Sequence, residues 1–190
     1  MGEQPPVISP LRFIHNPART IALLAAIFIL PGTLLSGGSP RRAGSPFATV
    51  PEQLGLQMRE MINRDRSATA SFEETKGRAR PLVWDERLAA VARAHSEDMA
   101  SNGFFSHEGS DGSLPDARVS REGIQWRAVG ENIAKSRDIE QAEEAFMNEP
   151  KFKQNHRANI LNPNYTRVGI GIVKGPDGTL YITQDFAQLW

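Results

Sequence analysis

The spacing of apolar residues predicts two long helices in the first half of the chain. The first covers residues 51–66 and carries on one face Leu54, Met58, Met61 and Ile62. Residues 67–80 are polar and predict a loop. The second helix follows Asp85, which suits the N-cap position, and its apolar stripe continues to Asn102. Gly103 is placed to end it.

The middle of the chain shows weaker patterns. Residues 103–130 contain many glycines and turn residues, so we expect them to be largely irregular, with a short helix near 115–122. A third amphipathic helix is predicted within 136–148, and Pro150 should stop or kink it. A further short helix is expected in 151–161.

The C-terminal segment has the alternating pattern of strands. Two apolar-rich runs, RVGIGIVK and TLYITQDFAQ, flank GPDG at residues 175–178. A Pro-Asp-Gly turn between such runs predicts a β-hairpin. Helices therefore come first and antiparallel strands last, which indicates the α+β class with a sheet covered by helices.

The N-terminal segment has a different character. Residues 20–35 carry no charge and would form a helix about 24 Å long, which is short for a membrane span and suits the apolar region of a signal peptide. A buried core helix is the alternative interpretation. We expect a signal peptide or membrane anchor in 1–38, a linker in 39–50 and one domain in 51–190. The domain would be secreted, or extracytoplasmic and attached to the membrane only through this segment.

Composition excludes several classes of function. The 190-residue chain has 22 acidic and 22 basic residues, and neither this balance nor any basic-aromatic pattern suggests nucleic-acid binding. The absence of cysteine excludes disulfides, thiolate nucleophiles and thiolate metal ligands. The chain has no G-x-S-x-G elbow and no phosphate-binding loop.

Five segments follow one another in a fixed order and together cover roughly residues 54–188: PLVWDERLAAVARAHSEDMA, FFSHEG, GENIA, HRANILNPNYTRVGIGI and YITQDFA. This ordered set resembles the CAP superfamily of extracellular domains, also called SCP-like or PR-1-like, in its bacterial type. The resemblance implies a three-layer α-β-α sandwich with a central antiparallel sheet. It agrees with the α+β class and the export signal inferred above.

The resemblance also implies a cleft lined by two histidines and two glutamates that can hold a divalent ion such as zinc. His107 matches the histidine of the SH segment, and Glu131 matches the glutamate of the GEN segment. Glu149 matches the second glutamate, because it lies three residues after Phe146, where the family usually has tryptophan.

The match to the second histidine of the family pattern is less direct. In animal and plant members a histidine precedes the YTQ segment, whereas here Asn164 precedes Tyr165. Bacterial members carry a histidine in HRxNIL, which is His156 here, after four additional residues. Two interpretations stay open: His156 replaces the missing ligand, or it only packs its helix.

These residues would support metal chemistry or binding alone. Imidazoles of His107 and His156 suit Zn²⁺ or another divalent cation, and the nearby carboxylates can ligate the ion, orient a histidine or accept a proton. His95 lies on an apolar helical stripe and is better explained as a packed histidine. Glu143 and Glu144 are expected to be solvated.

We expect an exported, non-catalytic binding module for a small apolar or amphipathic ligand, with a divalent-metal site in the cleft. One alternative is a zinc-dependent hydrolase acting on peptides or cell-envelope components, with Glu131 or Glu149 as general base. The other is a structural or adhesive module that meets a protein or cell-envelope partner. The residues identify no particular ligand, and fold alone does not fix function.

Overall fold

The computed structural model describes residues 7–10, 14–15, 50–151 and 154–190. The expected apolar export segment and nearly all of the linker therefore lie outside the described residues. Among the helices within these ranges, none is both long and apolar enough to cross a membrane.

A six-stranded sheet forms the middle of the domain, in the order β1-β4-β6-β5-β3, with β2 also paired to β4. The pairs are antiparallel except for the short β3, which runs parallel to β5. The strands are β1 (Val7–Pro10), β2 (Ile14–His15), β3 (Val83–Trp84), β4 (Trp126–Ser136), β5 (Arg167–Lys174) and β6 (Leu180–Leu189).

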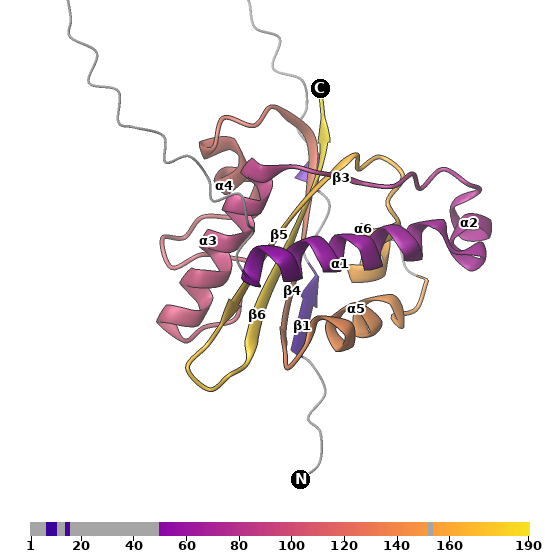
Figure 1. The fold of residues 1–190 in the computed structure, drawn as a ribbon. Coiled ribbons are helices and arrows are strands. Elements are labelled where there is room, and N and C mark those ends of the chain that lie inside the picture. Colours follow the sequence, from indigo (N-terminus) through magenta and orange to yellow (C-terminus); the bar gives the residue numbers. More distant parts are fainter. Residues whose placement is uncertain (1–6, 11–13, 16–49, 152–153) are drawn as a thin grey trace, which may run out of the picture.

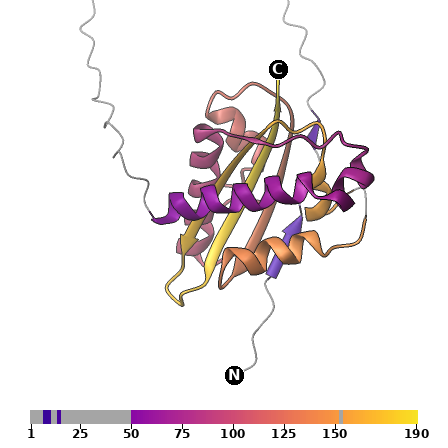
Figure 2. The ribbon, with the colours of Figure 1, turned by 45° about the vertical axis from the view of Figure 1, so that its right-hand side comes forward.

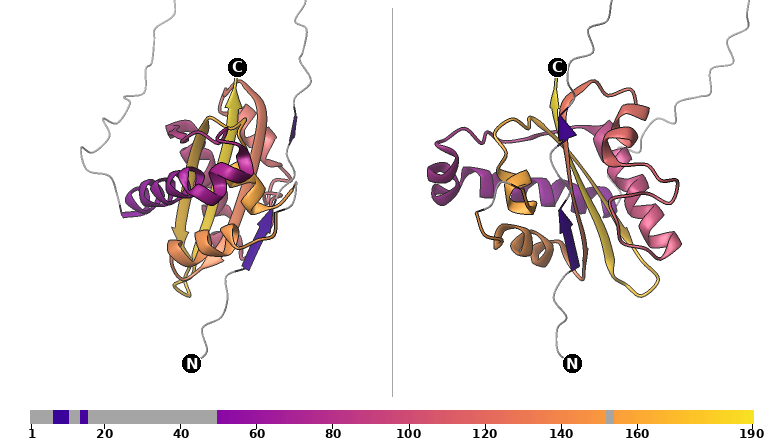
Figure 3. Two further views of the ribbon diagram at one scale, coloured as in Figure 1. Left: turned by 90° about the vertical axis from the view of Figure 1, so that its right-hand side faces the viewer. Right: turned by 180° about the vertical axis from the view of Figure 1, so that it is seen from behind.

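Helices cover both faces of this sheet (Figures 1 and 2). On one face lie α1 (Val50–Ser67), α5 (Ile139–Met147) and α6 (His156–Leu161), with α2 (Thr69–Thr75) following the end of α1. On the other face lie α3 (Glu86–Asn102) and α4 (Pro115–Arg121). The views in Figure 3 separate the three layers, and they confirm the predicted α-β-α sandwich.

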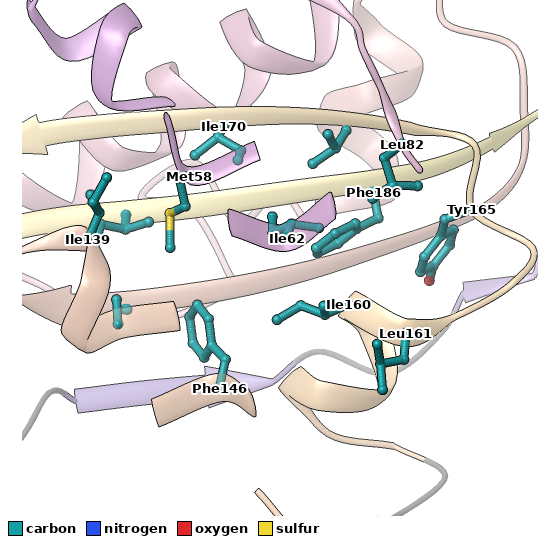
Figure 4. Packing of buried hydrophobic residues seen from close by; sticks show 14 of the residues in the cluster. Met58, Ile62, Leu82, Ile139, Phe146, Ile160, Leu161, Tyr165, Ile170 and Phe186 are labelled. Carbon is teal, nitrogen blue, oxygen red and sulfur yellow. The ribbon is translucent and has the colours of Figure 1, made fainter. Parts of the chain in front are cut away.

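The larger core cluster lies between the sheet and the α1, α5 and α6 layer (Figure 4). The predicted apolar face of the first helix points into it, and Met58 and Ile62 are fully buried. Phe146, Ile160 and Phe186 contribute from α5, α6 and β6. These contacts explain why helices with modest intrinsic preference are stable here, since burial of an apolar face supplies most of their stability.

The opposite layer approaches the sheet closely because β5 has glycines on that face. A Cβ at Gly169 would overlap the backbone of Leu88 and Ala89, and one at Gly171 would overlap the backbone of Arg93. Helix α3 therefore lies directly on the β5 backbone, and this close packing fixes its position relative to β4 and β6.

Local signals predicted the ends of α3 correctly. The Asp85 carboxylate accepts hydrogen bonds from the backbone N–H groups of Arg87 and Leu88. Gly103 ends the helix in the left-handed conformation, at φ 70°. The C-terminal hairpin is confirmed as well: β5 and β6 pair in register around the turn that contains Gly178, at φ 84°.

One prediction about local structure was wrong: the expected loop at 67–80 contains α2, where Ser71 and Thr75 are buried despite their polarity. The region 103–130 is largely irregular and contains the short helix α4, as expected, although β4 begins within it at Trp126. The short helix expected within 151–161 is confirmed as α6, which begins at His156 because Asn155 caps it.

Candidate functional site

The first part of the site is centred on Glu131, in the middle of β4. Its side chain is fully buried on the α3 face of the sheet. One carboxylate oxygen lies 2.6 Å from Nδ1 of His107, and the other accepts a hydrogen bond from Arg118 at 2.6 Å. A buried carboxylate is stable only with such partners, so the site is a compensated ionic cluster.

Arg118 also holds the loop that carries His107. One guanidinium nitrogen donates to the backbone oxygens of His107 (3.0 Å) and Ser113 (2.7 Å). The loop is further tied to α3, where Asp98 accepts hydrogen bonds from the backbone N–H and the hydroxyl of Ser110. The position of the His107 ring is therefore fixed from both ends of its loop.

Two further titratable groups belong to this cluster. Asp185 lies opposite Glu131 in the register of β4 and β6, and it is fully buried. Burial and the neighbouring Glu131 raise the pKa of Asp185 well above its ordinary value. Burial also raises the pKa of Glu131, whereas the Arg118 charge lowers it. We infer that Asp185 holds the proton of this pair and Glu131 the charge.

His95 is a packed histidine, as its place on the apolar stripe predicted. Its Nε2 lies 2.9 Å from the backbone oxygen of Ser106, so this nitrogen carries the hydrogen. Burial, followed by the charge of Arg118, lowers the pKa of His95 to about 4. The ring is therefore neutral at physiological pH and supports the loop that leads to His107.

The second part of the site is formed by His156 and Glu149. The two oxygens of Glu149 lie 2.7 Å from Nδ1 of His156 and 2.9 Å from its backbone nitrogen, which donates to the carboxylate. The imidazole stacks on Phe146, with ring centroids 4.6 Å apart. Glu149 is thus a partner of His156 rather than a freely solvated charge at a helix end, and its side chain is 21% exposed.

The two histidine–carboxylate pairs are connected through consecutive residues of β4. Glu131 holds His107 with its side chain, while its backbone oxygen accepts from Asn159 of α6 at 3.2 Å. Asn132 donates to the backbone oxygen of His156 at 3.3 Å and accepts from Asn159 at 2.8 Å. The strand therefore positions both pairs, with the His107–Glu131 pair on the α3 face of the sheet and the His156–Glu149 pair on the α6 face.

A buried polar chain continues from Asn132 toward α5. Asn132 donates to Gln184, and Gln184 donates to the Glu143 carboxylate, both at 2.9 Å. Glu143 is 1% exposed, so the prediction that it is solvated was wrong, whereas Glu144 is exposed as expected. Burial raises the pKa of Glu143 to about 8. The helical period places Glu143 on the buried face of α5, four residues after Ile139 and three before Phe146.

The described side chains do not form a closed metal centre. Each histidine has a carboxylate at Nδ1, an arrangement that orients imidazoles toward a ligand through the other ring nitrogen. Within the described ranges, however, no group of three or more His, Asp or Glu side chains is placed to hold a metal. Glu131 and Glu149 are engaged as partners of the imidazoles, so any ion bound by the two histidines would take its remaining ligands from water or a bound molecule.

Two residues of the cluster were missed by the sequence reasoning. Arg118 falls in a short helix with no motif around it, and Asp185 lies within the YITQDFA segment that supplied only a resemblance. The available signal was Asp185 itself, a carboxylate in the middle of a predicted strand. Its partner on another strand could not be read from the sequence.

Comparison with known proteins gives a consistent result. The model of the cysteine-rich secretory protein family, CAP, matches residues 59–186. Two proteins of Bacillus subtilis (strain 168) are similar. The uncharacterized protein YkwD is 38% identical over 115 residues, which are 60% of this chain and 42% of YkwD. The uncharacterized membrane protein YlbC is 38% identical over 111 residues, 57% of this chain and 29% of YlbC. The chain thus matches less than half the length of either relative.

Solved structures show the same fold. An extracellular protein with an SCP domain from Bacillus anthracis is 26% identical with a TM-score of 0.61, over 76% of this chain and 45% of that one. An outer surface protein from Borrelia burgdorferi is 18% identical with a TM-score of 0.59, over 71% of this chain and 92% of that one. At 18% identity, the similarity to the Borrelia burgdorferi protein shows the fold alone.

Proposed function

Because the chain belongs to the cysteine-rich secretory protein (CAP) family, we propose that it is an exported, non-catalytic binding module whose ligand site contains the His107–Glu131 and His156–Glu149 pairs. The family match over residues 59–186 supports the domain assignment. The similar Bacillus anthracis protein is extracellular, which supports a location outside the cytoplasm.

The observation that carries this proposal is the engagement of both glutamates. A general base must reach the proton that it removes. Glu131 is fully buried, and its two oxygens contact Arg118 and His107. Glu149 contacts the ring and the backbone of His156. The carboxylates therefore orient the imidazoles, which favours binding over hydrolysis.

A divalent ion is part of this proposal. Zn²⁺ would bind through the imidazoles of His107 and His156 and would supply Lewis-acid attraction for an anionic or carbonyl group of the ligand. Two protein ligands form a weaker site than the three or four of most zinc proteins, so we expect an exchangeable ion.

A hollow of about 430 Å³ between α1 and α5 is separate from the two histidine–carboxylate pairs, and five of its eight lining residues are charged, so it does not identify the ligand. The expectation of a small apolar or amphipathic ligand rests on the family resemblance. After delipidation, the full chain should take up such a molecule from a panel of fatty acids, sterols and phospholipids, as detected by native mass spectrometry. Uptake of none would contradict this part of the proposal.

Zinc titration of the full chain by calorimetry tests the metal site. We expect one-to-one binding that is lost in His107→Ala and also in His156→Ala, while circular dichroism shows that both variants are folded. Glu108→Gln, which changes an exposed residue next to His107, should bind zinc as the parent does.

Absence of zinc binding by the parent would overturn the metal proposal. Loss of binding in only one histidine variant would show that the two residues do not share an ion. Metal-dependent turnover that disappears in a folded Glu131→Gln variant would instead establish the hydrolase.

A further inference from the structure

The outer edge of β4 has an unusual occupant. On its inner side, β4 pairs with β6 along most of its length. On its outer side it pairs with two strands from the beginning of the chain, β1 opposite residues 132–135 and β2 opposite residues 128–129. The right-hand view in Figure 3 shows β1 lying alongside β4. Without these two strands, β4 would be the edge of the sheet.

The described pairing reaches the candidate site from both sides. Pro10 lies opposite Asn132, and Ile14 lies opposite Val129. β1 ends in a proline, which cannot donate a ladder hydrogen bond.

The β4 edge lacks the features that usually prevent strand addition. Exposed edges are typically short or interrupted by proline, bulges or outward charges. β4 is 11 residues long, contains no proline, and has buried side chains through most of its length. Its pairing with β6 is regular from Ala128 to Ser136. An edge of this kind is a template for an additional strand.

We propose that the outer edge of β4 is a binding site for an extended, uncharged peptide strand that adds antiparallel to the sheet, and that residues 7–10 are its occupant within this chain. Backbone hydrogen bonds supply the affinity in this mode of recognition. The VISP sequence of β1 carries no charged residue, in keeping with the buried character of β4. The site needs no metal, so it does not depend on the proposed function.

The place of β1 in the chain gives this site a consequence for export. Residues 7–10 precede the uncharged stretch 20–35 that resembles an export signal. Their pairing with β4 requires both to be on the same side of a membrane, so residues 7–10 can occupy the edge only before export. Removal of the predicted leader, 1–38, or its insertion into a membrane would free the β4 edge, and an extended, uncharged strand from another polypeptide would take the same place.

Disulfide trapping tests the occupant directly, because the chain has no cysteine of its own. Val7 and Lys135 are paired across the strands, and directly opposed residues have Cα separations of about 4.5–5.5 Å, which a disulfide spans. We expect the full-length Val7→Cys/Lys135→Cys variant to form an intramolecular disulfide. The control Val7→Cys/Lys174→Cys, with the second cysteine on β5, should not form one. Equal rates of oxidation in both variants would overturn the proposed occupant.

A peptide titration tests the site itself. The full-length Ile8→Pro/Ser9→Pro variant lacks two backbone donors of β1, so its β4 edge should be open. A fluorescent peptide of residues 5–11, which carries no charged side chain, should bind this variant at least tenfold more tightly than the parent, with or without zinc. The same peptide carrying both prolines should bind neither protein. No binding to the variant, or equal affinity for variant and parent, would overturn the proposal.

Discussion

Glu131 shows how a single residue determines the electrostatics of its surroundings. A fully buried carboxylate needs charge compensation, which Arg118 supplies at 2.6 Å. The neighbouring groups adapt to this pair: we infer that Asp185 holds a proton, and His95 stays neutral because burial and Arg118 lower its pKa to about 4. Of the two histidines in the cluster, His107 is therefore the one whose ring directly contacts the charged Glu131 carboxylate.

Replacement of Arg118 should therefore have a large effect on stability. Arg118→Ala leaves Glu131 buried without its compensating charge and removes hydrogen bonds to the loop oxygens of His107 and Ser113. We expect the free energy of unfolding to fall by about 3 kcal/mol in urea denaturation. Arg121→Ala removes an ion pair with Asp111 that is exposed to solvent, and it should change the free energy of unfolding far less than Arg118→Ala does. Similar losses in both variants would contradict the role assigned to Arg118.

The sequence pointed to two members of this cluster and missed their partners. His107 and Glu131 were proposed as site residues, together with His156 and Glu149, through the family resemblance, which rests on short segments in a fixed order. Arg118 and Asp185 reach Glu131 from a different helix and a different strand. Such contacts depend on tertiary placement, for which a single sequence has no local signal.

At the scale of elements, the contact between α3 and β5 positions the cluster. Helix α3 carries His95 and anchors the loop before His107, and it lies on the backbone of β5 at Gly169 and Gly171. No side chain separates the helix from the strand at these points. A larger residue would displace α3, and the loop that holds His107 would move with it.

A pair of glycine substitutions separates this packing effect from backbone strain. Gly169→Ala should lower the free energy of unfolding by about 3 kcal/mol or more, because its Cβ meets the backbone of α3, which cannot move aside as a flexible side chain would. Gly103→Ala should cost about 1 kcal/mol, since nothing lies within 4 Å of its Cβ and only the positive φ is unfavourable. Thermal unfolding of both variants measures the difference. A smaller loss for Gly169→Ala than for Gly103→Ala would contradict this account.

Elements with local signals could be predicted, and those defined by tertiary burial could not. The Asp85 cap, the Gly103 stop and the Pro-Asp-Gly hairpin each depend on a few adjacent residues. The β4 strand has glycine, glutamate and asparagine at its centre, and these residues are uncommon in strands. It is a strand because β6 and the helices on both faces bury it.

At the scale of the whole molecule, buried titratable groups determine how stability varies with pH. Burial raises the pKa of Glu143 from 4.5 to about 8, an effect opposed by its hydrogen bond with Gln184. Between these values the folded chain holds a proton that the unfolded chain has released, so stability decreases as pH rises. His95 acts oppositely: its pKa falls from 6.5 to about 4, so stability decreases as pH falls through that range. Below pH 6.5 the effects of Glu143 and His95 on stability oppose each other. Above pH 6.5, of these two effects only that of Glu143 remains.

The full chain should therefore be less stable at pH 8 than at pH 6.5, by about 2 kcal/mol from Glu143 alone, since one proton corresponds to about 1.4 kcal/mol per pH unit. Asp185, whose pKa is also raised by burial, adds to this decrease in stability with pH.

The Glu143→Gln variant tests this assignment. It keeps an oxygen for the hydrogen bond from Gln184 and removes the titrating group, so it should flatten the slope of stability against pH and stabilise the protein at pH 8. Glu144→Gln, an exposed neighbour on α5, should leave the slope unchanged. Urea denaturation of the parent and both variants, at about pH 6.5 and about pH 8, measures these slopes. An unchanged slope in Glu143→Gln would show that Glu143 is ionised in the folded chain, and the buried polar chain from Asn132 to α5 would then have to carry a negative charge.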